Sequence, residues 1–233
     1  MKARRVAFLI LIALTVTHLA QAFTVAGIDA RGGVTWIGNG YKEYPDGTTV
    51  QGSDVSPLRP FLGAAVPLQL SPALVFTPAL DLFRQEYLAV EDGKVVPTQI
   101  ETGSAAGDLA ATLGVILSLP LSYEWSPAER FTLGVGGGPT LVLRLPIGPI
   151  DGSDASPLWD YFFSDLRFLY PEAQFALRYE ASERIEVGGL LRVLWPVAPL
   201  ITDYEVPLWD EMKIALMATV RFRRDAGTDT EIR

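Results

Sequence analysis

The side chains that could do chemistry in this chain are carboxylates and arginines, because histidine and cysteine are almost absent. The sequence holds no cysteine and a single histidine, His18, which lies in an N-terminal segment that we expect to be removed. Catalysis by Ser-His or Asp-His groups needs a histidine that moves protons near neutral pH. The sequence therefore predicts that the protein is not an enzyme, and it predicts no cofactor and no metal site.

The charged residues recur at one parity of alternating segments, where they would line an interior. The candidates for this lumen charge network are Asp29, Arg31, Arg59, Asp81, Arg144, Glu172, Arg178, Glu186, Arg192, Lys213 and Arg221. Glu186 is expected to meet Arg178 or Arg221, and Arg192 to meet Glu172. One level near the short turns is expected to hold Glu124, Arg130, Arg178, Glu180, Arg184, Glu186 and Arg221. Because buried charges must be paired, mixed signs at matched heights favour a network that closes the lumen. A narrow or gated path for solutes is the alternative.

Strands must position these residues, since apolar and polar or small side chains alternate with a period of two. Eight such segments are present, at residues 25–37, 58–70, 74–82, 109–125, 130–145, 169–181, 185–197 and 211–223. Three connections between them are short and begin with serine, around Ser71, Ser126 and Ser182, whereas the others are long. Short and long connections that alternate on an even number of antiparallel strands are typical of transmembrane barrels.

The face that carries the large apolar residues is expected to meet lipid. The opposite face is rich in small residues, and the interior of an eight-stranded barrel is just wide enough for side chains to fill it. The aromatic residues of the apolar face form two expected girdles, Phe76, Tyr123, Trp125, Phe131, Tyr179 and Phe222 near the short turns and Trp36 and Trp195 near the long loops. Such girdles flank a lipid-facing band. The alternative is a soluble barrel of lipocalin type, with its apolar face inward.

The composition and the N-terminal segment indicate a protein that is exported and inserted into a membrane. Residues 1–22 combine an apolar run, basic residues and a final Ala-Gln-Ala, the pattern of a cleaved signal peptide. We expect residues 23–223 to form one barrel and residues 224–233 a short polar tail. The chain is 49% hydrophobic with a mean hydropathy of +0.25, yet no later apolar run is long enough for a transmembrane helix. The net charge of −8 makes nucleic acid a poor partner.

In this architecture the chain resembles the small eight-stranded outer-membrane proteins of the OmpA, OmpX and OmpW type. The resemblance implies a bacterial outer-membrane protein, monomeric, with lipid and the barrel insertion machinery as partners. Such barrels often end on an aromatic residue that this machinery reads, and Val220-Arg221-Phe222 fits that ending. Eleven further residues follow, which is a departure from the pattern. No counterpart of the periplasmic peptidoglycan-binding domain of OmpA is present.

The long loops contain an unusual number of apolar residues. The loop apolar cluster consists of Trp159, Tyr161, Phe162, Phe163 and Trp209, and Pro-Leu-Trp-Asp occurs twice in it. These residues could pack on each other or anchor the barrel at the membrane surface. They could also form an apolar mouth, as the OmpW resemblance implies, or a surface for partners. The sequence accordingly predicts a narrow passive channel or a binding protein for small, hydrophobic solutes. The alternative is a structural or adhesin-like barrel with a plugged lumen, whose loops bind partners.

Overall fold

The structure is a computed structural model that describes most of the predicted barrel. It describes residues 23–38, 41–43, 49–51, 58–89, 95–96, 109–147, 159, 162–201 and 209–224. The expected signal peptide at 1–22 and the tail from 225 onward lie outside the described residues, and so does Tyr161. No helix within the described ranges has the length and apolar character needed to cross a membrane.

The wall of the molecule is a closed ring of antiparallel strands. Its members are β2 (Gly27–Ile37), β5 (Leu58–Ala65), β8 (Ala79–Ala89), β10 (Leu109–Ser118), β12 (Phe131–Pro146), β13 (Leu169–Ser182), β14 (Ile185–Leu194) and β15 (Lys213–Arg223). Each strand pairs with the next one in this order, and β15 pairs with β2 from Lys213↔Ile37 to Arg223↔Gly27. The predicted eight-stranded antiparallel up-and-down barrel is thus confirmed.

Four short strands continue the wall toward the end that carries the short turns. They are β1 (Thr24–Val25), β6 (Leu68–Gln69), β7 (Leu74–Phe76) and β11 (Leu121–Ala128). They are separated from β2, β5, β8 and β10 by interruptions that contain Pro67, Pro78 and Pro120 in three of the four cases. Proline has no N–H to donate to the ladder, which accounts for these three interruptions.

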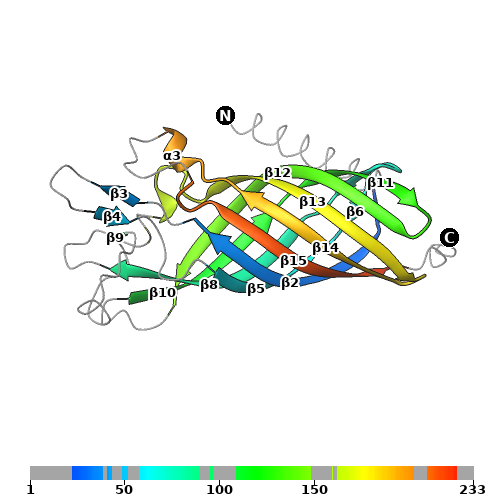
Figure 1. The fold of residues 1–233 in the computed structure, drawn as a ribbon, viewed down its shortest axis with the longest axis horizontal. Coiled ribbons are helices and arrows are strands. Elements are labelled where there is room, and N and C mark those ends of the chain that lie inside the picture. The colour runs from blue at the N-terminus through cyan, green and yellow to red at the C-terminus, as the bar shows by residue number, and fades with distance from the viewer. Residues whose placement is uncertain are drawn as a thin grey trace, which may run out of the picture.

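The other end of the barrel carries the long connections (Figure 1). Within their described parts lie β3 (Tyr41–Glu43), β4 (Thr49–Gln51), β9 (Val95–Val96) and the short helix α3 (Ala198–Ile201). β3 pairs with β4, and β9 pairs with the end of β8. The hairpin turns and the described end of the chain lie at the opposite end of the barrel in this view.

Two strand boundaries differ from the prediction for reasons visible in the backbone. β8 continues seven residues beyond Leu82, because it stays paired with β10 as far as Leu88↔Leu109. The last strand begins at Lys213 rather than at Glu211. Glu211 has a φ of 63°, a left-handed conformation that cannot continue a strand.

Apolar side chains cover the outside of the wall, as the parity predicts. Leu62 and Leu216 are 74% and 63% exposed, and Ile28, Val135 and Phe222 are also exposed. Charged side chains fill the inside, where Asp81 and Lys213 have no exposed surface. A soluble barrel would place these two sets the other way round, so the distribution supports lipid on the outside.

The interior also contains large apolar side chains, which the parity argument did not foresee. Phe61, Phe83, Ile116, Leu190 and Met217 belong to one buried cluster within the barrel. Neighbouring glycines make room for them. A side chain at position 114, which is paired with residue 83, would overlap the Phe83 ring. Charged and apolar residues therefore fill the lumen together.

Candidate functional site

At a level that we call the waist, the lumen of the barrel is closed by one carboxylate, Asp81, which lies between two arginines. Asp81 on β8 accepts hydrogen bonds from Arg31 Nε at 2.5 Å and from Arg31 Nη2 at 2.7 Å. The Nη1 atom of Arg192, on β14, lies 2.8 Å from Oδ2 of the same carboxylate, the oxygen that also accepts the bond from Arg31 Nη2. Because the three side chains come from three different strands and are buried, they join the walls across the lumen.

Glu172 is the exception at this level, since no arginine of the described residues forms an ion pair with it. Its Oε2 atom accepts a hydrogen bond from the Thr140 hydroxyl at 2.6 Å, and its Oε1 atom is buried without a partner. Thr140 lies 3.3 Å from the Ser118 hydroxyl, which accepts a hydrogen bond from Arg192 at 3.2 Å. Two hydroxyls thus stand between Arg192 and Glu172, where the sequence predicted a direct ion pair. The reason is register: Arg192 pairs with Gln174 on β13, and its side chain reaches across to Asp81.

A second layer closes the mouth beside the long loops. Arg144 forms an ion pair with Glu211 and donates a hydrogen bond to the Tyr170 hydroxyl at 3.0 Å. Lys213 binds the same Glu211 carboxylate at 3.2 Å. Phe162 is buried, and its ring centroid lies 5.0 Å from the Arg144 guanidinium carbon. Residues from two loops therefore enter the mouth and cover its charges.

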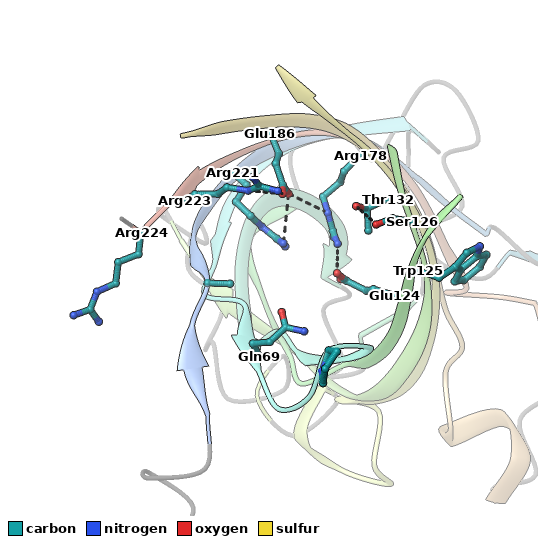
Figure 2. Close-up of a pocket in the computed structure, with 12 residues that line it drawn as sticks. Gln69, Glu124, Trp125, Ser126, Thr132, Arg178, Glu186, Arg221, Arg223 and Arg224 are labelled. Carbon is teal, nitrogen blue, oxygen red and sulfur yellow. Dashed lines mark hydrogen bonds and ion pairs between the residues drawn. The ribbon is translucent and has the colours of Figure 1, made fainter. Parts of the chain in front are cut away.

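A third layer lies at the short-turn end, where Glu186 is shared by three arginines (Figure 2). Arg178 and Arg221 approach it at 3.4 and 3.6 Å, and Arg223 Nε donates a hydrogen bond to it at 2.7 Å. Arg178 also forms an ion pair with Glu124 on β11. Outside this shared group, Arg221 binds Asp29 with two hydrogen bonds and Arg223 binds Glu180.

This third layer borders an open cavity, which we call the vestibule. Its volume is about 300 Å³, and its lining includes Gln69, Glu124, Arg178, Glu186, Arg221 and Arg223. A small extension of about 30 Å³ reaches Asp29, Arg31 and Gln174, just below the waist. In Figure 2 the Arg178, Glu124 and Glu186 side chains point into this space, whereas Trp125 and Arg224 point away from it. Within the described part of the chain, no group of three or more acidic, histidine or cysteine residues could hold a metal ion.

Ten of the eleven predicted lumen residues are buried, and the eleventh, Arg59, is partly buried. Arg130 and Arg184, expected at the short-turn level, are instead exposed in the turns. Arg130 donates a hydrogen bond to the Tyr179 hydroxyl at 3.4 Å, which raises the pKa of the Arg130 guanidinium above its usual value.

The predicted aromatic girdles lie on the outer surface at the two ends. Near the short turns, Tyr123 and Trp125 are in contact at 6.0 Å, and Phe131 and Tyr179 at 5.1 Å between ring centroids. Exposed members of the girdles include Tyr123, Trp125, Phe131, Trp195 and Phe222, whereas Trp36, Phe76 and Tyr179 are partly buried.

The loop aromatic residues divide between two places. Trp159 stacks on Phe163 at 5.1 Å, and Trp209 stacks on Trp36 of the wall at 6.5 Å. Trp159, Phe163 and Trp209 keep exposed surface, as membrane anchors would, whereas Phe162 turns into the mouth. The two Pro-Leu-Trp-Asp segments therefore each contribute one tryptophan to the rim.

Two residues of the mouth, Tyr170 and Glu211, could not be identified as site residues from the sequence. Tyr170 has the inward parity of its strand, so alternation alone places it in the lumen, but nothing marked it as a partner of Arg144. Glu211 was expected within the last strand. Its left-handed backbone conformation, which turns its carboxylate into the mouth beside Arg144 and Lys213, leaves no pattern in the sequence.

Comparison with known proteins finds similarity in fold and not in sequence. No protein-family model matches the chain, and no curated protein matches it. Among solved structures, Neisserial surface protein A (NspA) is 11% identical with a TM-score of 0.43, covering 86% of this chain and 99% of its own. The outer-membrane protein AlkL in lipid bilayers is 13% identical with a TM-score of 0.39, and the match covers 88% of this chain and 93% of AlkL. Ail, the attachment invasion locus protein of Yersinia pestis, was solved with a heparin analogue. It is 10% identical with a TM-score of 0.34, and the match covers 86% of this chain and 100% of Ail. The structural neighbours of this barrel are small outer-membrane barrels.

Proposed function

We propose that the protein is a bacterial outer-membrane barrel with a closed lumen, which holds its long connections at the cell surface for contact with partners. One observation carries the proposal: buried side chains join opposite walls at the waist, where Asp81 binds both Arg31 and Arg192. Of the two functions that the sequence predicts, this geometry supports the plugged barrel rather than the channel.

The surfaces at the two ends support the same orientation. The connections at the long-loop end include about 20 residues each, and tryptophans from two of them stand on the rim. Short turns on the periplasmic side and long loops outside are the usual arrangement in these barrels. Residues 23–233 contain neither histidine nor cysteine, so we also propose a role in binding rather than in catalysis.

Conductance in planar lipid bilayers tests the closed lumen. The purified full-length protein is expected to insert without single-channel currents, because the buried ion pairs of Asp81 with Arg31 and Arg192 cross the lumen at the waist. Arg192→Ala removes one of the two arginines from Asp81 and is expected to raise the frequency of brief openings. Stable channels of the unmodified protein, with a conductance that Arg192→Ala changes, would refute the proposal and restore the channel.

Labelling of single cysteines tests the orientation, and the absence of native cysteine makes the test clean. Gly47→Cys lies in the first long connection, and Ser71→Cys lies in a short turn. A membrane-impermeant maleimide applied to intact cells is expected to label position 47 and not position 71. Labelling of position 71 alone would show that the barrel is inserted the other way round.

A further inference from the structure

The rim at the long-loop end carries an apolar surface that takes no part in closing the lumen. Its residues are exposed and lie in the connections that follow β12 and β14: Ile147, Trp159, Phe163, Leu166, Leu200 and Ile201. We call these six residues the rim patch. None of them is charged, and exposed apolar side chains that gather in one place mark a surface that contacts another molecule or a membrane.

The two connections meet at the base of the rim patch. The ring of Phe163 lies 5.1 Å from the ring of Trp159. Leu169, which begins β13, donates a backbone hydrogen bond to the Leu166 carbonyl at 2.9 Å and accepts one from the Val197 amide at 3.2 Å. The helix α3 begins at the next residue, and Figure 1 shows it to one side of the barrel axis. The rim patch therefore belongs to one side of the rim.

The rim patch continues the lipid-facing surface of β12, the longest described strand of the wall. Every outward residue of β12 from Phe131 to Leu145 is apolar, and Ile147 extends the series. β12 has 16 residues, whereas β2, β14 and β15 have 11, 10 and 11. A tilted strand of ~9–11 residues already crosses the hydrocarbon layer. The apolar face of β12 is therefore longer than an upright barrel needs.

The apolar surface ends earlier on β8, two strands away from β12. The outward residues of β7 and β8 are apolar from Leu74 to Leu82, and the next one is Arg84, which is exposed. Leu113 of β10 is paired with Arg84 on one side and with Leu145 of β12 on the other. The charge on β8 thus lies in a register row where β12 is still apolar. The lipid-facing band reaches farther toward the long-loop end along β12 than along β8.

The connection after β14 extends the lipid-facing surface in the same direction. Apolar residues follow one another without interruption from Leu194, the end of β14, to Ile201, the end of α3. Ala198 is buried, whereas Leu200 and Ile201 are 59% and 56% exposed. Ile28, on the lipid-facing wall, is 57% exposed. These two residues of α3 are therefore as open as a side chain that the wall presents to lipid.

Leu166 has a backbone conformation that normally belongs to other residue types. Asp165 and Leu166 have φ values of 50° and 56°, in a tight turn that the Arg167 amide closes on the Ser164 carbonyl at 3.0 Å. Glycine and asparagine are the usual residues at such positions, because a Cβ atom makes the left-handed conformation unfavourable. An exposed leucine gains no burial in water that could offset this cost, whereas acyl chains would bury it.

We propose that the rim patch is a docking surface for the acyl chains of the outer leaflet, and that the barrel lies in the membrane with its β12 side deeper than its β8 side. The wall and the rim patch then form one continuous apolar surface, and Arg84 comes to the level of the headgroups. This proposal deepens the proposed function and rests on it for the sidedness, since it makes outer-leaflet lipid one partner of the long connections.

Collisions of single nitroxide labels with two relaxing agents test the proposal in phospholipid vesicles. Labels at Ile147→Cys, Leu166→Cys and Leu200→Cys report on the rim patch, and a label at Arg84→Cys is the control on the outer face of β8. Oxygen collects in hydrocarbon, and a nickel chelate stays in water. Power-saturation electron paramagnetic resonance is expected to give an oxygen-to-nickel collision ratio several-fold higher at the three patch positions than at position 84.

Charged variants test whether the rim patch holds the barrel in this position. Leu166→Lys combined with Leu200→Lys is expected to raise nickel collisions of the Ile147→Cys label several-fold. Asp165→Lys places the same side chain at an exposed position of the same turn, outside the rim patch, and is expected to leave the collisions unchanged. The gel shift reports folding of each variant, and Leu200→Lys alone, outside the strands, replaces the double variant if that variant does not fold.

Two results would overturn the proposal. Nickel collisions as frequent at the patch positions as at position 84 would place the rim patch in water. Few collisions with both agents would mean that protein covers it, and line broadening that disappears on dilution with unlabelled protein would identify a second copy of the chain. Neither result concerns the closed lumen, which conductance tests, or the sidedness, which labelling of intact cells tests. The two proposals can therefore fail independently.

Discussion

Replacing Asp81 by asparagine is the sharpest test of how the lumen is held. Asp81 is fully buried and is the shared partner of Arg31 and Arg192, whose side chains are 3% and 1% exposed. Asparagine keeps the shape and leaves two buried guanidinium groups without their counter-charge. Removing one partner of a buried ion pair costs about 3–5 kcal/mol. The unfolding equilibrium constant should therefore rise by about two to three and a half orders of magnitude.

Urea titration of the protein in lipid vesicles measures this effect through the gel shift between folded and unfolded forms. With a denaturant dependence of about 2 kcal/mol/M, the midpoint for Asp81→Asn should fall by about 1.5–2.5 M. Glu180→Gln is the matched control, because Glu180 and Arg223 are each about one-third exposed, and exposed pairs contribute about 0–1 kcal/mol. A loss below about 1 kcal/mol for Asp81→Asn would refute the view that this carboxylate closes the waist.

Three further predictions address packing, the lipid face and the rim. Gly114→Val should destabilise the barrel by about 1–3 kcal/mol, because the new side chain overlaps a phenyl ring on β8, whereas Gly189→Ala, whose new methyl group makes an ordinary contact at 3.8 Å with the Met217 carbonyl oxygen, should be neutral; equal urea midpoints would contradict the packing. Leu62→Arg should cost about 2–4 kcal/mol in vesicles, and a neutral result would argue that the outer face meets water. Trp36→Ala and Trp209→Ala, singly and together, should give a coupling energy of about 0.5–1.5 kcal/mol for the stacked rings, and additive effects would mean that the rim contact contributes nothing.

The wall of this barrel could be predicted from the sequence because alternation is a local property. Each strand shows its inward and outward faces without knowledge of its neighbours, so the ring and the buried position of Arg144 or Lys213 follow from parity. Strand boundaries could not be predicted where they depend on backbone conformation rather than on residue type. The start of the last strand depends on the left-handed φ of Glu211, and no residue type in the sequence indicates this conformation.

Partners across the lumen could not be predicted in the same way. Parity gives the face of a residue, and register gives its height, but the choice of partner depends on how far a long side chain reaches. Arg192 is beside Gln174 in the ladder, and it reaches Asp81 on a distant strand rather than Glu172 on the adjacent one. The apolar filling was also invisible, since Phe83 fits inside only because position 114 is glycine.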